Sequence, residues 1–444
     1  MSVRYAICGL SNRGLASFVL PLVGISGGRD SVLGYGSNTE DFSAHGTVVA
    51  IVDVDRKRVE DFIGRLLPEG YPPIAVYHPD DFEKMVDDTA PQRIIVASPD
   101  DSHETYILAA LARGLDVIAE KPMVTTAAGA ARVLAAEKKS AGSVQVTHNL
   151  RYTARHRQIK QLLLDGAIGR PLHISLNYFV NIRHGASYFL RWNRERSRSG
   201  GLSIHKSTHH LDLLNWWLSA EPKRIYAQGG RDFYGPESPH RPRSADGTPL
   251  TGAALRAADP YYRAQEGSGA FPSDANSDRL GLYDLPYHQQ YPAGQDKYLY
   301  DSDIDIEDHY AALVSYPGGV SASYAIDFSA PWEGYRLIIT GTHGQIETQT
   351  GRTPDGKVLT GTDKLILRPL FAPAQTVTIE QVLGGHEGAD PLLRHDLFIA
   401  PTAESERLGL VASSREGAVA VAAGEAIWRS IQADEPIDVL GLLK

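Results

Sequence analysis

Cysteine is almost absent from this chain, because its 444 residues contain only one, Cys8. A lone cysteine cannot form an intramolecular disulfide, and a structural zinc site of the Cys-rich kind is excluded. We therefore expect no metal site, and we expect the protein to work in a reducing compartment, the cytoplasm.

A dominant charge and a long hydrophobic run are also missing. Lysine and arginine number 44 against 53 acidic residues, which gives a net charge of -9 with both signs scattered along the chain. This distribution excludes the basic footprint of a nucleic-acid binder. No stretch approaches the ~18 apolar residues of a membrane helix, and "MSVRYAICGL" lacks the pattern of a signal peptide. The sequence predicts a soluble protein without nucleic-acid or membrane partners.

The apolar content and the length favour two domains. Residues 1–150 alternate apolar strands, such as "TVVAIVDVD" and "RIIVASP", with amphipathic helices. That order predicts an α/β Rossmann domain with a doubly wound parallel sheet. Residues 151–444 contain alternating strands with hairpin-like turns such as "YPGGV", which predict an α+β domain with a largely antiparallel open sheet. Two segments have no clear period: residues 21–46, and a long irregular insertion at 231–300 that we expect to be an ordered arm.

A glycine-containing turn follows the first strand, in "YAICGLSNRGLASFVL". The pattern is G-x-S-x-x-G, in which a serine replaces the middle glycine of the dinucleotide fingerprint. A small residue still lets phosphates approach the start of the following helix. The candidate cofactor-binding residues here are Gly9, Ser11, Asn12, Arg13 and Gly14.

Asp53 ends the second apolar strand, where an acidic residue can bind the ribose hydroxyls of a dinucleotide. A carboxylate at this place disfavours the 2′-phosphate of NADP, so we expect NAD as the cofactor. The basic residues Arg56, Lys57 and Arg58 follow closely and keep NADP as the alternative.

The stretch "GGLSIHKSTHHLDLLNWWL" (200–218) predicts one helix with two faces. Its leucines form an apolar stripe, and at about 3.6 residues per turn a second row contains His205, His209, Asp212 and Trp216. Asp212 is close enough in this helix to orient the imidazole of His209. We expect this row to face a cavity.

Three further patterns have simpler interpretations. "DSDIDIED" (301–308) begins like a calcium loop but lacks the glycine and the final acidic residue, so it predicts a strand with exposed acidic residues. "GGHEGAD" (384–390) lacks the spacing of zinc hydrolases and predicts a surface loop. "YFLRWNRERSRSGG" (188–201) is basic and aromatic, and it is expected to cover the nicotinamide or bind sugar through Arg191, Trp192 and Arg194.

The order of these motifs resembles the Gfo/Idh/MocA oxidoreductases over essentially the whole chain apart from the two irregular segments. The resemblance rests on G-x-S-x-x-G, the strand-ending Asp53, "ASPDDSHETYILAALARGLDVIAEKP", "HNLRY", the 200–218 stretch and "GTHGQIE". It implies a Rossmann domain, a C-terminal domain whose open sheet often mediates a homo-oligomer (a dimer or tetramer), and hydride transfer between nicotinamide and a sugar or polyol.

The resemblance also implies roles for individual residues. Lys121 of "EKP" would be the active-site lysine, and His209 the acid/base histidine. A pair at the entrance to the substrate domain would be Arg151 and Tyr152. Positions that usually border the cofactor are matched by Ser98, Pro99, His103, Glu120 and Asn149, together with Lys121.

Oxidation of a secondary alcohol needs a base, a cation or hydrogen-bond donor at the oxygen, and a positioned nicotinamide. We assign His209 as the base and Lys121 as the group that polarises the hydroxyl, while His205 or Lys206 binds a neighbouring hydroxyl and Trp192 lines the substrate site. The family pattern has an aspartate where this chain has His205. The expected activity is an NAD(P)-dependent dehydrogenase of a sugar, glycoside or cyclitol.

Two alternatives remain open. In the first, oxidation at a ring hydroxyl acidifies the adjacent carbon, so that a glycosidic bond is eliminated and the cofactor is regenerated, as in a redox glycosidase. In the second, the chain is a non-catalytic regulator that senses nucleotides. The retention of Lys121 and His209 argues against the second alternative, and the missing aspartate leaves it open.

Overall fold

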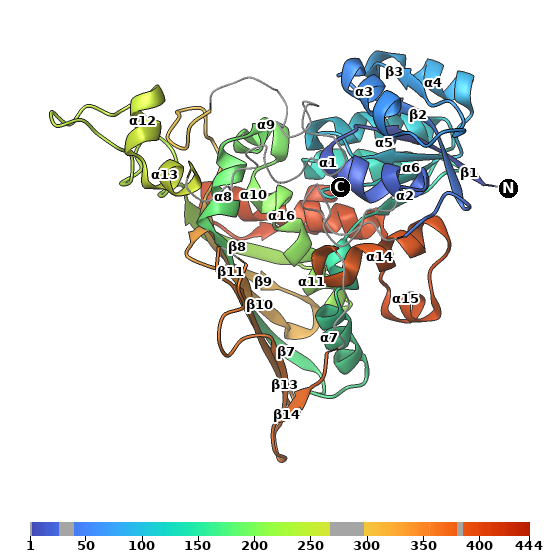
Figure 1. Ribbon diagram of the computed structural model, residues 1–444. Coiled ribbons are helices and arrows are strands. Elements are labelled where there is room, and N and C mark those ends of the chain that lie inside the picture. Colours follow the sequence, from blue (N-terminus) through green and yellow to red (C-terminus); the bar gives the residue numbers. More distant parts are fainter. Residues whose placement is uncertain (1, 26–39, 267–296, 355, 380–384) are drawn as a thin grey trace.

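The apolar runs of the N-terminal half form the first sheet of the computed structural model, which describes residues 2–25, 40–266, 297–354, 356–379 and 385–444 (Figure 1). Six strands are parallel, and a seventh joins them antiparallel at one edge, in the order β15-β6-β5-β4-β1-β2-β3. The strands are β1 (Val3–Cys8), β2 (Gly46–Val52), β3 (Ala75–Tyr77), β4 (Arg93–Val96), β5 (Asp116–Ala119), β6 (Val144–Val146) and β15 (Ala412–Ser413).

Helices lie between successive strands of this sheet and cover both of its faces. The doubly wound Rossmann fold is thereby confirmed, and its strands are buried because helices pack on both sides. The helices are α1 (Asn12–Gly14), a π-helical turn (Leu15–Val19), α2 (Leu20–Leu22), α3 (Arg56–Leu66), α4 (Phe82–Thr89), α5 (His103–Ala112) and α6 (Ala127–Glu137).

The second sheet has nine strands in the order β14-β13-β12-β11-β7-β10-β9-β8-β16. Only β7 and β10 pair in parallel, so the expected largely antiparallel sheet is confirmed. Its strands are β7 (Pro171–Asn181), β8 (Arg224–Gly230), β9 (His309–Ser315), β10 (Ser321–Ala330), β11 (Glu333–Gly341), β12 (Gly344–Arg352), β13 (Lys364–Pro369), β14 (Gln375–Val377) and β16 (Ile437–Asp438).

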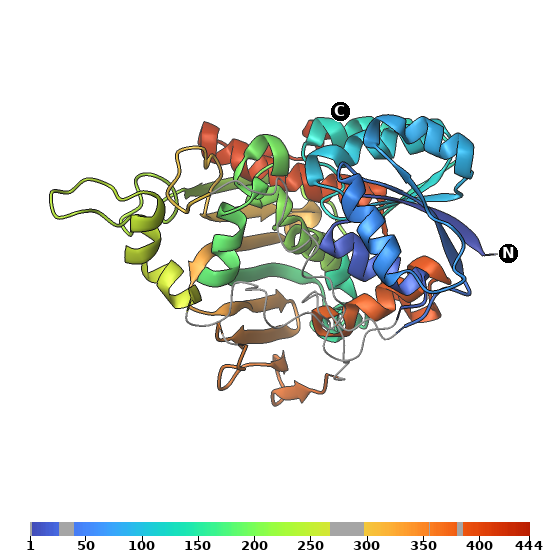
Figure 2. The same ribbon diagram turned by 45° about the horizontal axis from the view of Figure 1, so that its top comes forward.

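One face of the second sheet is covered by helices, and the opposite face is bare in Figures 1 and 2. Alternation along the strands matches this arrangement, because β10 buries every second residue. The helices that follow β6 along the chain are α7 (Ala154–Leu164), α8 (Ile182–Phe189), α9 (Arg196–Ser199), α10 (Leu202–His205), α11 (Thr208–Leu218), α12 (Gly252–Ala258), α13 (Pro260–Glu266), α14 (Gly385–Phe398), α15 (Ala403–Leu408) and α16 (Ser414–Ala433).

The end of the chain returns to the first sheet. Phe398 of α14 packs edge-on against the rings of Tyr5 and Phe18. Strand β15 then pairs with β6, and α16 follows with a capping box formed by Ser413 and Glu416. The Rossmann half is therefore completed by residues from the far end of the sequence.

The described part of the insertion carries α12 and α13, which project from the body of the molecule (Figure 2). Their side chains Leu255 and Tyr262 are buried and continue the hydrophobic core of the second sheet. The rest of the insertion, residues 267–296, lies outside the described residues, as do residues 26–39 of the other irregular segment.

Candidate active site

The glycine turn brings β1 close to the loop after β4. Gly9 has a φ of +93°, and a Cβ atom there would lie 2.4 Å from the Cα of Ser98, so the turn requires glycine. Ser11 caps α1: its hydroxyl accepts from the amide of Gly14 at 3.0 Å and donates to the carbonyl of Ala97 at 2.7 Å. The serine that replaces the middle glycine thus anchors the turn at its start.

Asp53 holds the same turn from the end of β2. Its Oδ2 accepts a hydrogen bond from the amide of Leu10 at 2.7 Å, and its Oδ1 accepts from the amide of Asp55 at 2.9 Å. Nearby, Arg56 and Lys57 pair with acidic residues one turn further along α3. The carboxylate of Asp53 therefore holds the backbone of the glycine turn in place.

Arg13 joins this turn to residues far away in the sequence. Its guanidinium donates to both carboxylate oxygens of Asp390 at 3.0 and 3.2 Å, and to Glu120 at 2.8 Å. The side-chain amide of Asn149 donates to Asp390 at 3.1 Å. We call Arg13, Glu120, Asn149 and Asp390 the Arg13 cluster. It connects α1, the loop after β5 and the 3-10 turn after β6 to α14.

Asp390 was missed because the sequence predicted a surface loop at 384–390. That prediction is wrong for the described residues, since α14 begins at Gly385 and Asp390 is buried. Residue 384 lies outside the described part. Asp390, Leu393 and Leu397 recur at helical spacing, and all three are buried on one face of α14. This helical period is the sequence signal that could have predicted α14 and the burial of Asp390.

Lys121 follows β5 at the carboxyl edge of the first sheet, and its amino group donates to the backbone carbonyl of His205 at 3.1 Å. Burial lowers the pKa of Lys121, and Asp100 and Glu120 only partly oppose this effect. The lysine and the segment that carries the histidines are therefore in direct contact.

His103 supports the loop that follows β4. Its two ring nitrogens lie 2.9 Å from the carbonyl oxygens of Pro122 and Ser98, and the hydroxyl of Ser98 contacts Ser102 at 2.6 Å. Pro99 directly precedes the 3-10 turn that contains Asp100. His103 therefore joins the Lys121 loop to the Ser98 loop.

The expectation of one uninterrupted helix over 200–218 is wrong. Helix α10 ends at His205 and α11 begins at Thr208. Between them, Ser207 donates its amide to Leu202, and its side chain contacts the hydroxyls of Tyr310 and Tyr324 at 2.5 and 2.6 Å. This break changes the helical phase, so the predicted polar row is divided.

His205 faces the Rossmann half. Its Nδ1 lies 2.5 Å from Asp100, and its Nε2 lies 3.3 Å from the amide nitrogen of Asn193. The ring of Trp192 packs edge-on against it. A carboxylate therefore reaches this cluster from the loop after β4, although the helix itself has a histidine where the family pattern has an aspartate.

Asp212 does not orient His209, so that expectation is wrong. Its carboxylate accepts from Nε and Nη2 of Arg151 at 2.8 and 2.5 Å, and both side chains are almost completely buried. Arg151 and the neighbouring Tyr152 are 1% exposed, so neither borders an open substrate site as predicted. Their burial makes them part of the support beneath the site.

His209 has no hydrogen-bond partner among the described residues, and its Nδ1 is buried; both ring nitrogens of the buried His148 lack a hydrogen-bond partner there as well. Burial, with the charges of Lys121 and Lys206, lowers its pKa well below the usual value. Lys206 lies over the ring of Tyr178, 5.5 Å from the centroid, and burial lowers its pKa to about 8. A neutral imidazole thus lies within the influence of two amino groups, of which Lys206 loses its charge as the pH rises through about 8.

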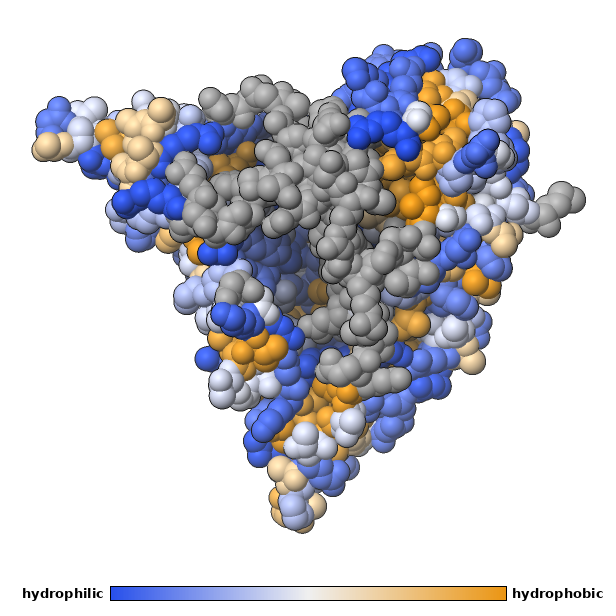
Figure 3. All heavy atoms as spheres, in the orientation of Figure 1, coloured by the Kyte–Doolittle hydropathy of each residue, from blue (hydrophilic) through white to orange (hydrophobic). Residues whose placement is uncertain are grey.

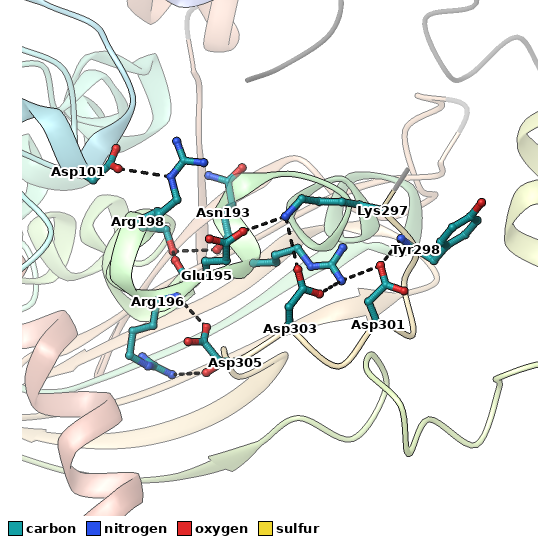
Figure 4. A network of polar contacts seen from close by, with 12 residues as sticks. Asp101, Asn193, Glu195, Arg196, Arg198, Lys297, Tyr298, Asp301, Asp303 and Asp305 are labelled. Carbon is teal, nitrogen blue, oxygen red and sulfur yellow. Dashed lines mark hydrogen bonds and ion pairs between the residues drawn. The ribbon is translucent and has the colours of Figure 1, made fainter. Parts of the chain in front are cut away.

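Residues 301–308 do not form a strand, which corrects the prediction for them. Asp301 and Asp303 pair with the buried Arg194, and Lys297 pairs with Glu195 at 2.8 Å (Figure 4). Figure 4 also shows the contact of Arg198 with Asp101 at 3.3 Å. These ion pairs attach the end of the insertion to the segment that carries Trp192, and that segment to the Rossmann half.

Within the part of the chain that the structure describes, no three His, Cys, Asp or Glu side chains are grouped so that they could hold a metal ion. None of its helices is both long enough and apolar enough to cross a membrane. The visible surface in Figure 3 mixes hydrophilic and hydrophobic residues.

Comparison with known proteins gives two family matches. Residues 18–148 match the profile described as "Oxidoreductase family, NAD-binding Rossmann fold", and residues 160–439 match "Oxidoreductase family, C-terminal alpha/beta domain". The oxidoreductase YteT of Bacillus subtilis is 39% identical over 98% of each chain.

Two further relatives are more distant. An inositol 2-dehydrogenase of Streptomyces avermitilis is 30% identical over 39% of this chain and 46% of its own length. A structure of levoglucosan dehydrogenase with NADH and L-sorbose covers all of both chains with a TM-score of 0.66 at 16% identity, which supports the same fold.

Proposed function

We propose, from the premise that this chain belongs to the Gfo/Idh/MocA family of oxidoreductases, that it is a dehydrogenase of a sugar, glycoside or cyclitol. The observation that carries the proposal is the position of His209, a neutral imidazole without a partner among the described residues, close enough to Lys121 to feel its charge. A base and a cation side by side are what oxidation of an alcohol needs.

The residues around the glycine turn fit a dinucleotide. Gly9 permits the close approach of a backbone, and the side-chain oxygens of Asn12 and Asn149 are buried without a hydrogen-bond partner among the described residues. We infer NAD as the cofactor, because Arg56 and Lys57, which could bind the 2′-phosphate of NADP, are paired with acidic residues of their own helix. NADP is kept as the alternative. When bound, the oxidised cofactor accepts the hydride from the carbinol carbon.

Side chains of this protein would accept the hydroxyl proton and stabilise the charge that develops on the oxygen. His209 accepts the hydroxyl proton, since its lowered pKa keeps the imidazole neutral before the reaction. Lys121, held by the carbonyl of His205, donates a hydrogen bond to the same oxygen and stabilises its developing charge. Lys206 binds a neighbouring hydroxyl, and the Asp100–His205 pair and Trp192 form the adjoining wall.

The substrate class is supported by the relatives, whose names refer to a cyclitol and an anhydro sugar. The experiment is an absorbance screen for reduced nicotinamide with sugars, glycosides and inositols, using NAD and NADP separately. Formation of NADH that depends on Lys121 and His209 is the expected result, and full turnover in His209→Asn would overturn the base assignment.

The same screen separates the other two activities. Release of an aglycone without net formation of NADH would select the redox glycosidase. Tight cofactor binding without turnover on any compound would select the nucleotide sensor.

We also infer a homo-oligomer formed through the bare face of the second sheet. Leu313 and Ile338 lie on that face and are 61% and 42% exposed. Light scattering after size exclusion tests this, since charged substitutions at both positions are expected to give a monomer.

A further inference from the structure

A second set of acid–base residues lies where α8 meets the start of β11. Nδ1 of His184 lies 2.9 Å from Glu333, and its Nε2 lies 2.9 Å from the hydroxyl of Tyr188. His184 and Tyr188 are four residues apart on α8, so both face the same side of that helix. The three side chains form a continuous chain of carboxylate, imidazole and phenol, which we call the Tyr188 relay.

The direction of the hydrogen bonds in this relay is set by Asn181. Its backbone amide and its side-chain amide both donate to Oε2 of Glu333 at 2.8 Å, which leaves Oε1 to accept from His184. Nδ1 of His184 therefore carries the proton, and Nε2 accepts from Tyr188. The side-chain oxygen of Asn181 also caps α8 by accepting from the amides of Arg183 and His184.

The charge states agree with this direction. Burial opposes ionisation of Glu333, yet the hydrogen bond from His184, the charge of Lys206 and the backbone amide of Asn181 lower the pKa of the carboxyl group overall. Burial also lowers the pKa of His184 despite the neighbouring carboxylate. The resting relay is therefore an ionised carboxylate, a neutral imidazole and a phenol, which is the arrangement that can take up a proton.

The relay borders open space and adjoins the candidate active site. His184 leaves 38% of its side-chain surface accessible and Glu333 leaves 22%, while Tyr188 is 7% exposed. The ring of Tyr188 packs edge-on against His205, 5.5 Å between centroids. The charge of Lys206 acts on both Glu333 and His209, so the relay and the catalytic histidine both lie near this amino group.

The fold brings α8 to this place through a close contact. A Cβ atom at residue 185 would lie 1.7 Å from the carbonyl oxygen of Phe328 in β10, so only glycine permits the approach. Gly185 lies directly after His184, and the contact therefore sets the height of the relay above the second sheet.

We propose that the Tyr188 relay is a second proton-transfer group, which exchanges the proton on the carbon next to the one that is oxidised. This inference rests on the proposed dehydrogenase function, because only a ketone acidifies that neighbouring carbon. Tyr188 is the group that meets the substrate, and His184 and Glu333 act through it.

The proton transfer balances within the chain. The C–H bond beside the carbonyl breaks, and its electron pair moves into an enolate whose oxygen faces the amino groups of Lys121 and Lys206. The proton joins the oxygen of Tyr188 while the phenolic proton of Tyr188 passes to Nε2 of His184. Glu333 stabilises the resulting imidazolium, and return of a proton from solvent along the same path completes the exchange.

The experiment measures two events on the same compound. The enzyme and NAD are incubated in D2O with each compound oxidised in the absorbance screen; NADH reports oxidation, and proton NMR of the ketone reports deuterium at the neighbouring carbon. We expect the ratio of exchange to oxidation to fall about 10²-fold in Tyr188→Phe, which removes only the hydroxyl. His184→Gln is expected to lower the same ratio, and Glu333→Gln to lower it less.

Tyr226→Phe is the matched control, since this tyrosine contacts Asp434 on the outer side and should leave both events unchanged. Thermal unfolding of each variant separates loss of the relay from loss of the fold. Oxidation without exchange in the wild-type protein would overturn the relay, as would full exchange in folded Tyr188→Phe. If no compound yields NADH, the proposed dehydrogenase function is refuted, and the proposal for the relay is refuted with it.

Discussion

On the Rossmann side of the candidate active site, Arg13 is paired with two carboxylates, whereas across the cavity His209 has no hydrogen-bond partner within the described residues. The paired groups satisfy one another before any ligand arrives, so they provide a fixed frame. An unpaired buried imidazole costs stability, and a bound substrate hydroxyl can supply its partner. The difference indicates which groups hold the site and which carry out its chemistry.

Removing the groups assigned to the chemistry, Lys121 and His209, should have the largest effect. Lys121→Met and His209→Asn are each expected to lower the rate of hydride transfer about 10³-fold, because one loses charge stabilisation at the oxygen and the other loses the base. Single-turnover NADH absorbance measures this rate. Lys139→Met, at an exposed lysine on the Rossmann surface, is the control and should retain full activity. A loss below tenfold in both variants would contradict the division between frame and chemistry.

Breaking a buried pair of the frame should lower stability instead. Arg151→Met leaves the carboxylate of Asp212 buried without its main cation, and we expect a loss of about 3 kcal/mol in the free energy of unfolding. Denaturant titration measures the loss. The exposed pair of Arg415 and Glu221 is the reference, since Glu221→Gln should cost about 0.5 kcal/mol. Equal costs for the two variants would refute the claim that the Arg151 pair supports the fold.

The Arg13 cluster tests whether the frame also serves the cofactor. Asp390→Asn should raise the Kd for NADH about tenfold, because Arg13 loses a charged partner and the position of Asn149 relaxes. Fluorescence titration of NADH measures this without a substrate. Glu404→Gln, at an exposed residue of α15, should leave the Kd unchanged. Asp390→Glu is expected to restore part of the affinity, and an unchanged Kd in Asp390→Asn would separate the cluster from cofactor binding.

The smallest effect is expected from titration of Lys206, whose pKa burial lowers to about 8. The amino group is a cation below that pH and becomes neutral as the pH rises through it. We expect KM for the substrate to rise about fivefold between pH 7 and pH 9, since a charged hydrogen bond is lost. Lys206→Arg keeps its charge over this range and should flatten the profile. The same rise in Lys206→Arg would assign the titration to another group.

Short-range patterns of the sequence predicted the fold well. Both sheets follow from apolar runs of strand length, continuous in the first sheet and alternating in the second, and these patterns depend on neighbours in the sequence. Lys121 was identified only through the family resemblance of the Glu-Lys-Pro motif, and in the structure it lies just after β5.

Pairings between distant residues could not be predicted in this way. Asp212 turns to Arg151, 61 positions earlier, and His205 turns to Asp100, 105 positions earlier. The break before Thr208 depends on hydroxyls from β9 and β10. Helical periodicity describes only which residues share a face, and here tertiary contacts decided which way each side chain turned.

The return of β15 to the edge of β6 has a consequence for the order of events during synthesis. The ribosome finishes the six parallel strands long before it makes residues 412–413, so the edge of β6 waits unpaired while the second sheet is made. An exposed edge is a template for pairing with other chains. The nascent protein is therefore most prone to aggregation in the interval before its last helix emerges, and a chain that ends near residue 410 would remain in that state.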